Sequence, residues 1–310
     1  MSVGPICSKP FSTIKGAIDD TAESHGRSQR HADPIRLYPY TPLPLSLVIR
    51  LLSALILLPI VIVAIWASPA ATFVLAIVVV ALACIEYARL VEGLGGDIPP
   101  LLSGIAAVTA CAAVAWHGSG VEIPLLAALV AAGGVPVARG RVDSGVLRDV
   151  AATLFPVLYL GVPIGALALV RITAGPGALL LLVLTLVASD SVQYYAGRAF
   201  GRRPLAAAIS PKKTQEGAIA GCVTAAAAMP LLGLFWLPDV APLLLVVLGL
   251  LVSGMGIVGD LFESALKRGA GVKDASGLIP GHGGILDRID GLLFAGPVYY
   301  LVLRLVPGNL

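Results

Sequence analysis

Acidic, basic and hydroxyl side chains gather in one stretch near the C-terminal end of this chain. Asp260, Ser264 and Lys267 stand at i, i+4 and i+7, which places all three on one face of a helix. Asp287 and Asp290 stand at i and i+3 and therefore also share a face. Three carboxylates brought together repel one another unless a cation lies between them. Carboxylate oxygens suit Mg²⁺, which proteins usually hold with one or two carboxylates and the phosphates of a substrate.

The stretch therefore predicts a Mg²⁺ site formed by Asp260, Asp287 and Asp290 beside a bound phosphate compound. The alternative is a charged surface loop with ion pairs such as Asp287 to Arg288. A solvated loop has no need of His282 and the glycines beside it, which favours the site. His282 is expected in a loop, where binding phosphate or ordering the loop ranks above metal ligation. The predicted substrate-binding residues of this stretch are Arg268, Lys273, Asp274, His282, Gly283, Gly284 and Arg288.

A second polar stretch begins with Asp190, at the end of a long apolar run. Lysine ammonium and hydroxyl groups close to a helix N-terminus form a phosphate site, because the backbone N–H groups there also attract anions. A loop that is basic only because it faces the cytoplasm would explain the lysines and arginines, but not Asp190 or the hydroxyls. The predicted substrate-binding residues here are Asp190, Arg198, Ser210, Lys212, Lys213, Thr214 and Glu216. Glu86 lies within an apolar run, either as a functional acid or as a partner of Arg89 near the membrane edge.

The elements that carry these residues are predicted to be transmembrane helices. Of the 310 residues, 57% are hydrophobic and 13% are charged, about half the 25% usual in soluble domains. This excludes an ordinary soluble enzyme, and the low charge excludes a disordered chain. A net charge of +3 is too small to indicate a nucleic-acid partner. Long unbroken apolar runs favour helices over the alternating strands of a barrel.

The charge-free runs predict an all-α, polytopic membrane bundle of about nine transmembrane helices. The predicted spans are 46–66, 71–91, 98–121, 123–138, 150–170, 172–189, 217–238, 240–259 and a last one starting near Leu292. Residues 1–45 form a flexible cytoplasmic tail before the first span, which acts as a signal anchor. Residues 46–310 form the catalytic domain, with cytoplasmic loops at 196–216 and 260–290.

The placement of basic residues predicts the orientation. With the N-terminus inside, 19 of the 21 lysines and arginines lie in cytoplasmic segments, and only Arg171 and Arg304 lie outside. We therefore expect a multi-pass protein of the cell (inner or plasma) membrane, with the N-terminus in the cytoplasm.

A known family shares this polar pattern. The phosphatidate cytidylyltransferases, or CDP-diacylglycerol synthases, have a signature that resembles the run Ser264-x-x-Lys267-Arg268-x-x-x-x-Lys273-Asp274-x-x-x-x-x-Pro280-x-His282-Gly283-Gly284-x-x-Asp287-Arg288-x-Asp290. The run Asp190…Gly197-Arg198…Phe200-Gly201…Ser210-Pro211-Lys212-Lys213-Thr214-x-Glu216-Gly217 is similar to a second region of that family. The resemblance covers about residues 46–306. Gln215 departs from it, because an aromatic residue is expected there, which affects only the packing of the loop.

The resemblance implies the reaction CTP + phosphatidate → CDP-diacylglycerol + pyrophosphate, with Mg²⁺ required and K⁺ sharing the metal centre. It also implies a homodimer in contact with membrane lipid. By resemblance, the catalytic set is Asp260, Ser264, Lys267, Asp287 and Asp290, with the three acids on the metal and the other two near substrate phosphates. The residues agree, because a lipid phosphate oxygen is already ionised at neutral pH and needs no general base.

Other functions remain open from the sequence. A CTP-dependent enzyme acting on another lipid, such as a polyprenol kinase or an ether-lipid cytidylyltransferase, would need similar loops. A transporter would also have many helices, but it would place charges at the membrane midplane and often in repeated halves. Here the charges cluster at one predicted face.

Overall fold

The computed structural model describes residues 44–117, 120–279, 281 and 283–306, and the side chains from residue 55 onward except His117. The chain divides into Met1–Pro42 and Leu43–Leu310, and the second unit is the one described below. Most of the predicted tail, and His282, lie outside the described residues.

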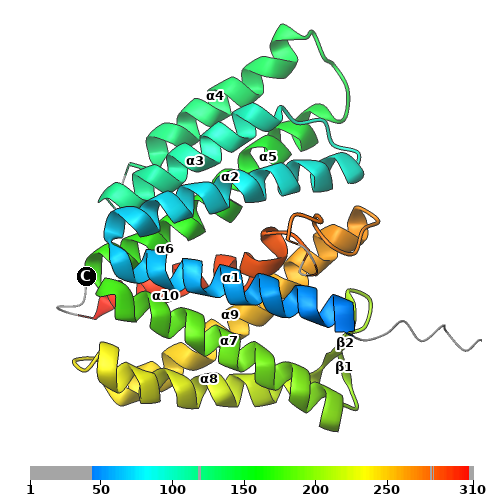
Figure 1. The fold of residues 1–310 in the computed structure, drawn as a ribbon. Coiled ribbons are helices and arrows are strands. Elements are labelled where there is room, and N and C mark those ends of the chain that lie inside the picture. Colours follow the sequence, from blue (N-terminus) through cyan, green and yellow to red (C-terminus); the bar gives the residue numbers. More distant parts are fainter. Residues whose placement is uncertain (1–43, 118–119, 280, 282, 307–310) are drawn as a thin grey trace, which may run out of the picture. The chain divides into compact units, whose positions relative to one another are not determined.

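Helices make up nearly all of the second unit within these residues (Figure 1). They are α1 (Pro44–Ala67), α2 (Pro69–Gly93), α3 (Pro100–His117), α4 (Glu122–Ala138), α5 (Val146–Pro156), the π-helical turn η1 (Val157–Gly161), α6 (Val162–Thr173), α7 (Gly175–Phe200), α8 (Gln215–Trp236), α9 (Pro242–Gly269) and α10 (Leu286–Leu305). The all-α prediction is confirmed. One short antiparallel pair, β1 (Pro204–Ala206) and β2 (Ser210–Thr214), was not expected. The two polar loops are also shorter than predicted, because α7, α9 and α10 extend into them.

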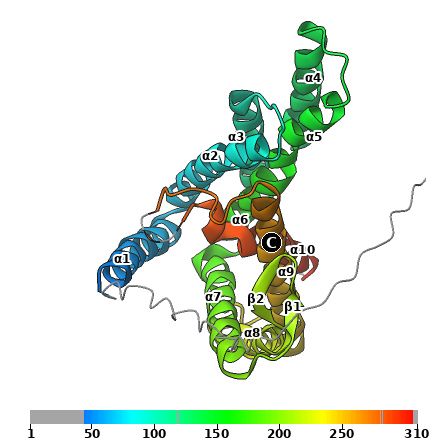
Figure 2. The same ribbon diagram turned by 90° about the vertical axis from the view of Figure 1, so that its right-hand side faces the viewer.

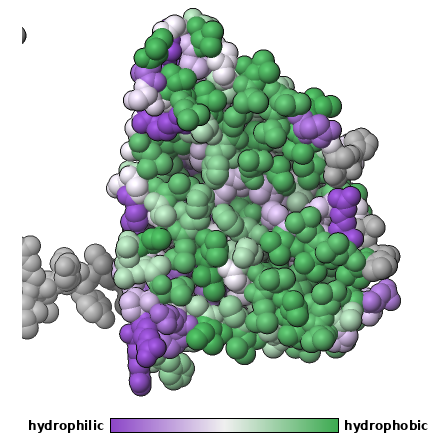
Figure 3. Space-filling view, turned by 180° about the vertical axis from the view of Figure 1, so that it is seen from behind, coloured by the Kyte–Doolittle hydropathy of each residue, from purple (hydrophilic) through white to green (hydrophobic). Residues whose placement is uncertain are grey.

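The helices have the length and composition of membrane spans. Within the part of the chain that the structure describes, five segments are long and apolar enough to cross a bilayer, namely Pro69–Gly93, Val146–Thr173, Gly175–Phe200, Gln215–Trp236 and Pro242–Gly269. Leu55–Ala67, Pro100–Trp116 and Glu122–Ala138 are shorter apolar helices. Figure 3 shows a broad hydrophobic surface, with hydrophilic residues gathered toward its two ends. The chain is therefore a polytopic helical membrane protein, and the count of nine spans stays a prediction.

Capping residues set two helix starts that matter for the site. Ser68 accepts a hydrogen bond from Ala71 N at 3.0 Å, and Pro69 follows it at the first position of α2. The predicted separation of the first two spans, 46–66 and 71–91, is thus confirmed. Thr214 caps α8 in the same way, accepting from Gly217 N at 3.2 Å. It ends β2 and begins α8, so the lysine before it is held in place.

Small residues let the helices around the site approach closely. The most extensive contacts join α7 with α8, α8 with α9, and α9 with α10. Figure 2 shows α7, α8 and α9 together, with α6 and α10 between them and α2 to α5. A Cβ on Gly249 would lie 2.3 Å from the carbonyl oxygen of Ala225, so α8 and α9 meet there backbone to backbone.

Candidate active site

Lys213 on β2 forms an ion pair with Asp260 on α9. The Ser264 hydroxyl, one helical turn further along α9, donates to Asp260 Oδ1 at 3.3 Å. The predicted shared face of Asp260 and Ser264 is therefore confirmed. The two polar loops of the sequence, which are far apart along the chain, meet at this ion pair.

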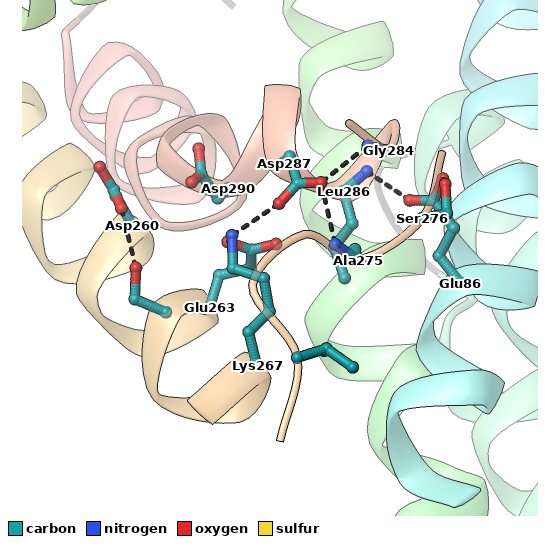
Figure 4. Close-up of polar contacts among 12 residues, drawn as sticks. Glu86, Asp260, Glu263, Lys267, Ala275, Ser276, Gly284, Leu286, Asp287 and Asp290 are labelled. Carbon is teal, nitrogen blue, oxygen red and sulfur yellow. Dashed lines mark hydrogen bonds and ion pairs between the residues drawn. The ribbon is translucent and has the colours of Figure 1, made fainter. Parts of the chain in front are cut away.

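Lys267 lies between two carboxylates, those of Glu263 and Asp287 (Figure 4). Its Nζ is 2.6 Å from Asp287 Oδ1 and also forms an ion pair with Glu263 Oε2. The Glu263 side chain is fully buried, and those of Lys267 and Asp287 are 11% and 7% exposed. A charge in such a place is costly unless it is paired, so each member of the triad depends on the others.

Asp287 also organises the start of α10. Its Oδ2 accepts hydrogen bonds from Gly284 N at 2.7 Å and from Ala275 N at 3.0 Å. A carboxylate at this position interacts favourably with the positive end of the helix dipole. Asp287 therefore joins the α9–α10 loop to the helix that carries Asp290.

Glu86, from α2, holds the same segment from the other side (Figure 4). Its carboxylate accepts from the Ser276 hydroxyl at 2.6 Å, from Ile285 N at 3.0 Å and from Leu286 N at 2.8 Å. The residue is 2% exposed. Of the two readings left open by the sequence, the suggested pairing with Arg89 is replaced by these contacts, which make Glu86 the cap of α10.

The structure around Gly283 and Gly284 leaves no room for a larger side chain at either position. Gly283 has φ +82°, and a Cβ there would lie 2.6 Å from Asp287 Oδ2. A Cβ on Gly284 would lie 2.5 Å from Glu86 Oε2. Both positions thus let a carboxylate reach backbone N–H groups, which is a loop-ordering role. Their predicted contact with substrate stays a prediction.

Asp290 and Asp190 complete the cluster. Asp290 lies within electrostatic range of Asp260, Lys213 and Lys267, and its Oδ1 accepts from Gly291 N at 2.7 Å. Asp190, on α7, lies within range of Lys213 and Asp260 and accepts from Gln193 Nε2 at 3.2 Å. Acidic and basic side chains from α7, β2, α9 and α10 therefore lie within electrostatic range of one another and form a single lysine–carboxylate cluster.

The predicted metal ligands are only partly brought together. Among the described residues, no group of three His, Cys, Asp or Glu side chains is arranged to hold a metal ion. Asp260 and Asp290 are close enough to interact, while Asp287 is engaged by Lys267 and two backbone N–H groups. The three-acid Mg²⁺ site stays a prediction.

The other predicted substrate-binding residues are mostly exposed, or hydrogen-bonded within their own loops. Arg198, Lys212, Lys273 and Asp274 are exposed, as is Arg288. Arg268 donates to the carbonyl oxygen of Val272 at 3.3 Å. Glu216 accepts from the backbone N–H groups of Arg202 and Arg203 at 3.0 and 3.3 Å, so it orders the α7–α8 loop. Ser210 begins β2.

Glu263 was missed by the sequence reasoning. Its spacing from Lys267, i and i+4 on one helix, is the usual signal for an ion pair and could have indicated it. Tyr159 was also missed. It is a buried tyrosine on the π-helical turn, within range of Glu263 and Asp290, and its ring stacks on Phe155. No spacing pattern in the sequence marks it.

Replacing Gly259 with Ala is expected to lower activity at least tenfold. A Cβ there would lie 2.3 Å from the Asp290 carbonyl oxygen, so α9 and α10 must separate where Asp260 and Asp290 face each other. The measurement is the turnover rate of the purified protein after reconstitution in lipid. Gly254→Ala, in the same helix, is the matched control, because nothing lies within 4 Å of its added Cβ. Equal turnover in the two variants would contradict the close packing of the site.

The fold and the site together define the class of this protein. It is a polytopic helical membrane protein with a site rich in lysines and carboxylates at the ends of α7, α9 and α10. Residues 48–306 match the model of a family described as the cytidylyltransferase family. The chain belongs to this family.

Named relatives are found in bacteria and plants. The chain is 35% identical to a phosphatidate cytidylyltransferase of Mycobacterium bovis over 223 residues, which are 68% of this chain and 72% of the relative. It is 35% identical to one of Helicobacter pylori over 188 residues, 61% of this chain and 67% of the relative. It is 45% identical to phosphatidate cytidylyltransferase 5, chloroplastic, of Arabidopsis thaliana over 135 residues, 43% of this chain and only 33% of the relative. The chain thus spans about a third of that plant protein and about two thirds of the bacterial ones.

Proposed function

We propose that the chain transfers the cytidylyl group of CTP to phosphatidate, forming CDP-diacylglycerol and releasing pyrophosphate. The observation that carries the proposal is the pairing of Lys213 and Lys267 with three carboxylates, those of Asp260, Glu263 and Asp287, in a chain that matches the cytidylyltransferase family over residues 48–306. Both substrates are phosphate anions, and the cluster offers cations that carboxylates hold in place.

The reaction forms one P–O bond and breaks another. An oxygen of the phosphatidate phosphate attacks the α-phosphorus of CTP, and the bond from that phosphorus to the bridging oxygen of the β-phosphate breaks. Pyrophosphate leaves with the electron pair of that bond. No proton must be removed from the nucleophile, so the site needs charge neutralisation and positioning rather than a base.

The chain's own residues perform those two tasks in the proposal. Lys213 would exchange Asp260 for a phosphate oxygen, and Lys267 would donate its third N–H, beyond those used by Glu263 and Asp287, to another phosphate oxygen. Both would neutralise charge on the attacked phosphate and the leaving group. Ser264 now donates its one hydroxyl proton to Asp260, and it would turn that donor to a phosphate oxygen when CTP binds. Glu263 and Asp287 keep Lys267 charged and fixed, which gives it the pre-organised position that electrostatic catalysis requires.

Mg²⁺ fits the oxygen donors of the site. It needs only one or two carboxylates together with substrate phosphates, so the absence of a three-ligand group among the described residues does not oppose it. Asp260, Asp287 and Asp290 would hold the ion, with K⁺ beside it as the family resemblance implies. When bound, Mg²⁺ would supply positive charge to phosphate oxygens.

The proposal places the cluster at the cytoplasmic face of the cell membrane, in a homodimer. Cysteines introduced at Ala207 and Ala208, which are exposed in the α7–α8 loop, test the orientation. We expect an impermeant maleimide to label them only after the cells are opened. Labelling of intact cells from outside would reverse the topology. Crosslinking in native membranes tests the homodimer.

Lys213→Ala is expected to raise the KM for CTP about tenfold or more, and more than Lys212→Ala does. Lys213 is paired with Asp260 inside the cluster, whereas Lys212 is exposed on the same strand, so the two variants remove equal charge at different places. Initial rates at varied CTP and varied phosphatidate measure the effect. A change in the KM for phosphatidate alone would assign Lys213 to the lipid.

The product decides between enzyme classes. Purified protein given CTP, Mg²⁺ and dioleoyl phosphatidate should release pyrophosphate and form CDP-diacylglycerol in equal amounts. Release of CDP with a phosphorylated lipid would show a kinase instead. Turnover only with a different lipid phosphate would change the acceptor and keep the cytidylyl transfer.

A further inference from the structure

We propose that the cavity between the C-terminal end of α7 and the N-terminal end of α8 binds the head group of an anionic glycerophospholipid. This cavity has a volume of about 590 Å³. Its lining consists of Ala199, Phe200, Gly201, Arg202, Arg203, Gln215, Glu216 and Ile219. None of these residues belongs to the lysine–carboxylate cluster, and the proposal does not depend on the function assigned to that cluster.

The cavity has a fixed wall. A Cβ on Gly201 would lie 2.2 Å from the Gly197 carbonyl oxygen and 2.6 Å from Thr214 Cγ2, so the chain leaves α7 tightly against the start of α8. The hydrogen bonds from Arg202 N and Arg203 N to Glu216 then tie the next two residues to α8. The two arginines are thus presented by an ordered turn.

The lining of the cavity has a net positive charge, because it contains two arginines and one carboxylate, that of Glu216, which lies within electrostatic range of Arg203. Glu216 is the one carboxylate among the lining residues, and its Oε2 accepts both backbone N–H groups. Among the described residues, neither the Arg202 nor the Arg203 guanidinium has a carboxylate within ion-pair distance, and both residues are exposed. Guanidinium groups bind phosphate with two parallel hydrogen bonds.

The other side of the cavity is apolar. Phe200 and Ile219, which line it, are 72% and 65% exposed. On α8 the exposed apolar surface continues with Val223, one helical turn after Ile219, while Tyr194 and Tyr195 are exposed on other faces of α7; all three are more than 60% exposed. Tyrosines at this level are typical of the boundary between head groups and acyl chains. The phosphate of a lipid would bind the arginines while its acyl chains contact the apolar surface. Inorganic phosphate has no apolar part and would gain nothing from that surface.

Native mass spectrometry of the full-length protein, released from detergent, tests the proposal. Dioleoyl phosphatidylglycerol and dioleoyl phosphatidylcholine are added separately, and the lipid-bound fraction gives an apparent Kd. We expect tighter binding of phosphatidylglycerol, and a loss of about tenfold or more in Arg202→Gln/Arg203→Gln. Arg139→Gln/Arg148→Gln is the matched control, because it removes the same charge from arginine side chains that are each 56% exposed but paired with Asp97 or Asp149. It should bind like the wild type.

Three results would overturn the proposal. These are equal binding of the two lipids, an equal loss in the control double variant, and displacement of the lipid by millimolar inorganic phosphate, which would assign the cavity to free anions. If the arginine variant fails to fold, Ile219→Asn tests the apolar half with both arginines intact. It should weaken phosphatidylglycerol binding, and unchanged binding would refute the lipid assignment.

Discussion

Asp290→Asn is expected to lower turnover by about 10²- to 10³-fold while the helical bundle stays folded. Asparagine keeps the shape of the side chain, and its oxygen can still accept the hydrogen bond from Gly291 N. What it removes is the negative charge that lies within range of Asp260, Lys213 and Lys267. Without that charge the lysines are held less firmly, and a proposed ligand of Mg²⁺ is lost.

Turnover across Mg²⁺ concentrations, together with the thermal transition of each variant, measures the effect. Asp260→Asn should behave like Asp290→Asn, with the higher Mg²⁺ requirement of a weakened metal site. Asp239→Asn is the control, because Asp239 is exposed in the connection between α8 and α9, outside the cluster. Wild-type rates in both cluster variants at every Mg²⁺ concentration would refute the metal assignment.

The helices could be predicted from the sequence because the membrane imposes a simple rule. A charge-free run of sufficient length must become a helix, so the positions of charged residues outline most of the spans. The break at Ser68 was equally readable, since a cap and a proline follow local rules. These features depend only on neighbours in the chain.

The contacts of the site could not be predicted in the same way. β2 pairs with β1 over a few residues with no alternating pattern, so nothing local indicated the hairpin that presents Lys213. The sequence analysis named most of the acids and lysines that the structure brings together, but not which carboxylate each lysine would meet. It treated Asp287 as a metal ligand, whereas the structure shows that its oxygens also order the start of α10.

Glu86 illustrates the limit most clearly. Ser276, Ile285 and Leu286, whose groups it accepts, lie 190 or more residues further along the chain. A buried acid in an apolar run indicates some special role. Which role it has depends on the packing of α2 beside the loop before α10, and that packing is a property of the whole fold.

Glu86→Gln is expected to loosen the start of α10 and to lower turnover at least tenfold. The Gln amide must place its NH₂ at one of the two oxygen positions, so that it faces the backbone N–H of either Ile285 or Leu286, where the carboxylate now accepts. A buried donor without an acceptor costs about 1–3 kcal/mol, and the favourable charge at the helix N-terminus is lost as well. The first turn of α10, which holds Asp287 and Asp290, would then unfold locally more often.

Hydrogen exchange separates this effect from general destabilisation. We expect faster exchange at Ile285 and Leu286 in Glu86→Gln, with exchange in the distant helix α8 unchanged. Glu92→Gln is the matched control, because Glu92 is an exposed glutamate on the same helix, α2. Glu86→Asp, which keeps the charge on a shorter side chain, should recover part of the protection and part of the turnover. If Glu86→Gln leaves both the exchange at α10 and the turnover at wild-type values, Glu86 does not position Asp287 and Asp290 for the proposed reaction. Since a carboxylate that merely filled space would be replaced by glutamine without effect, only the capping role predicts local opening and lost turnover together.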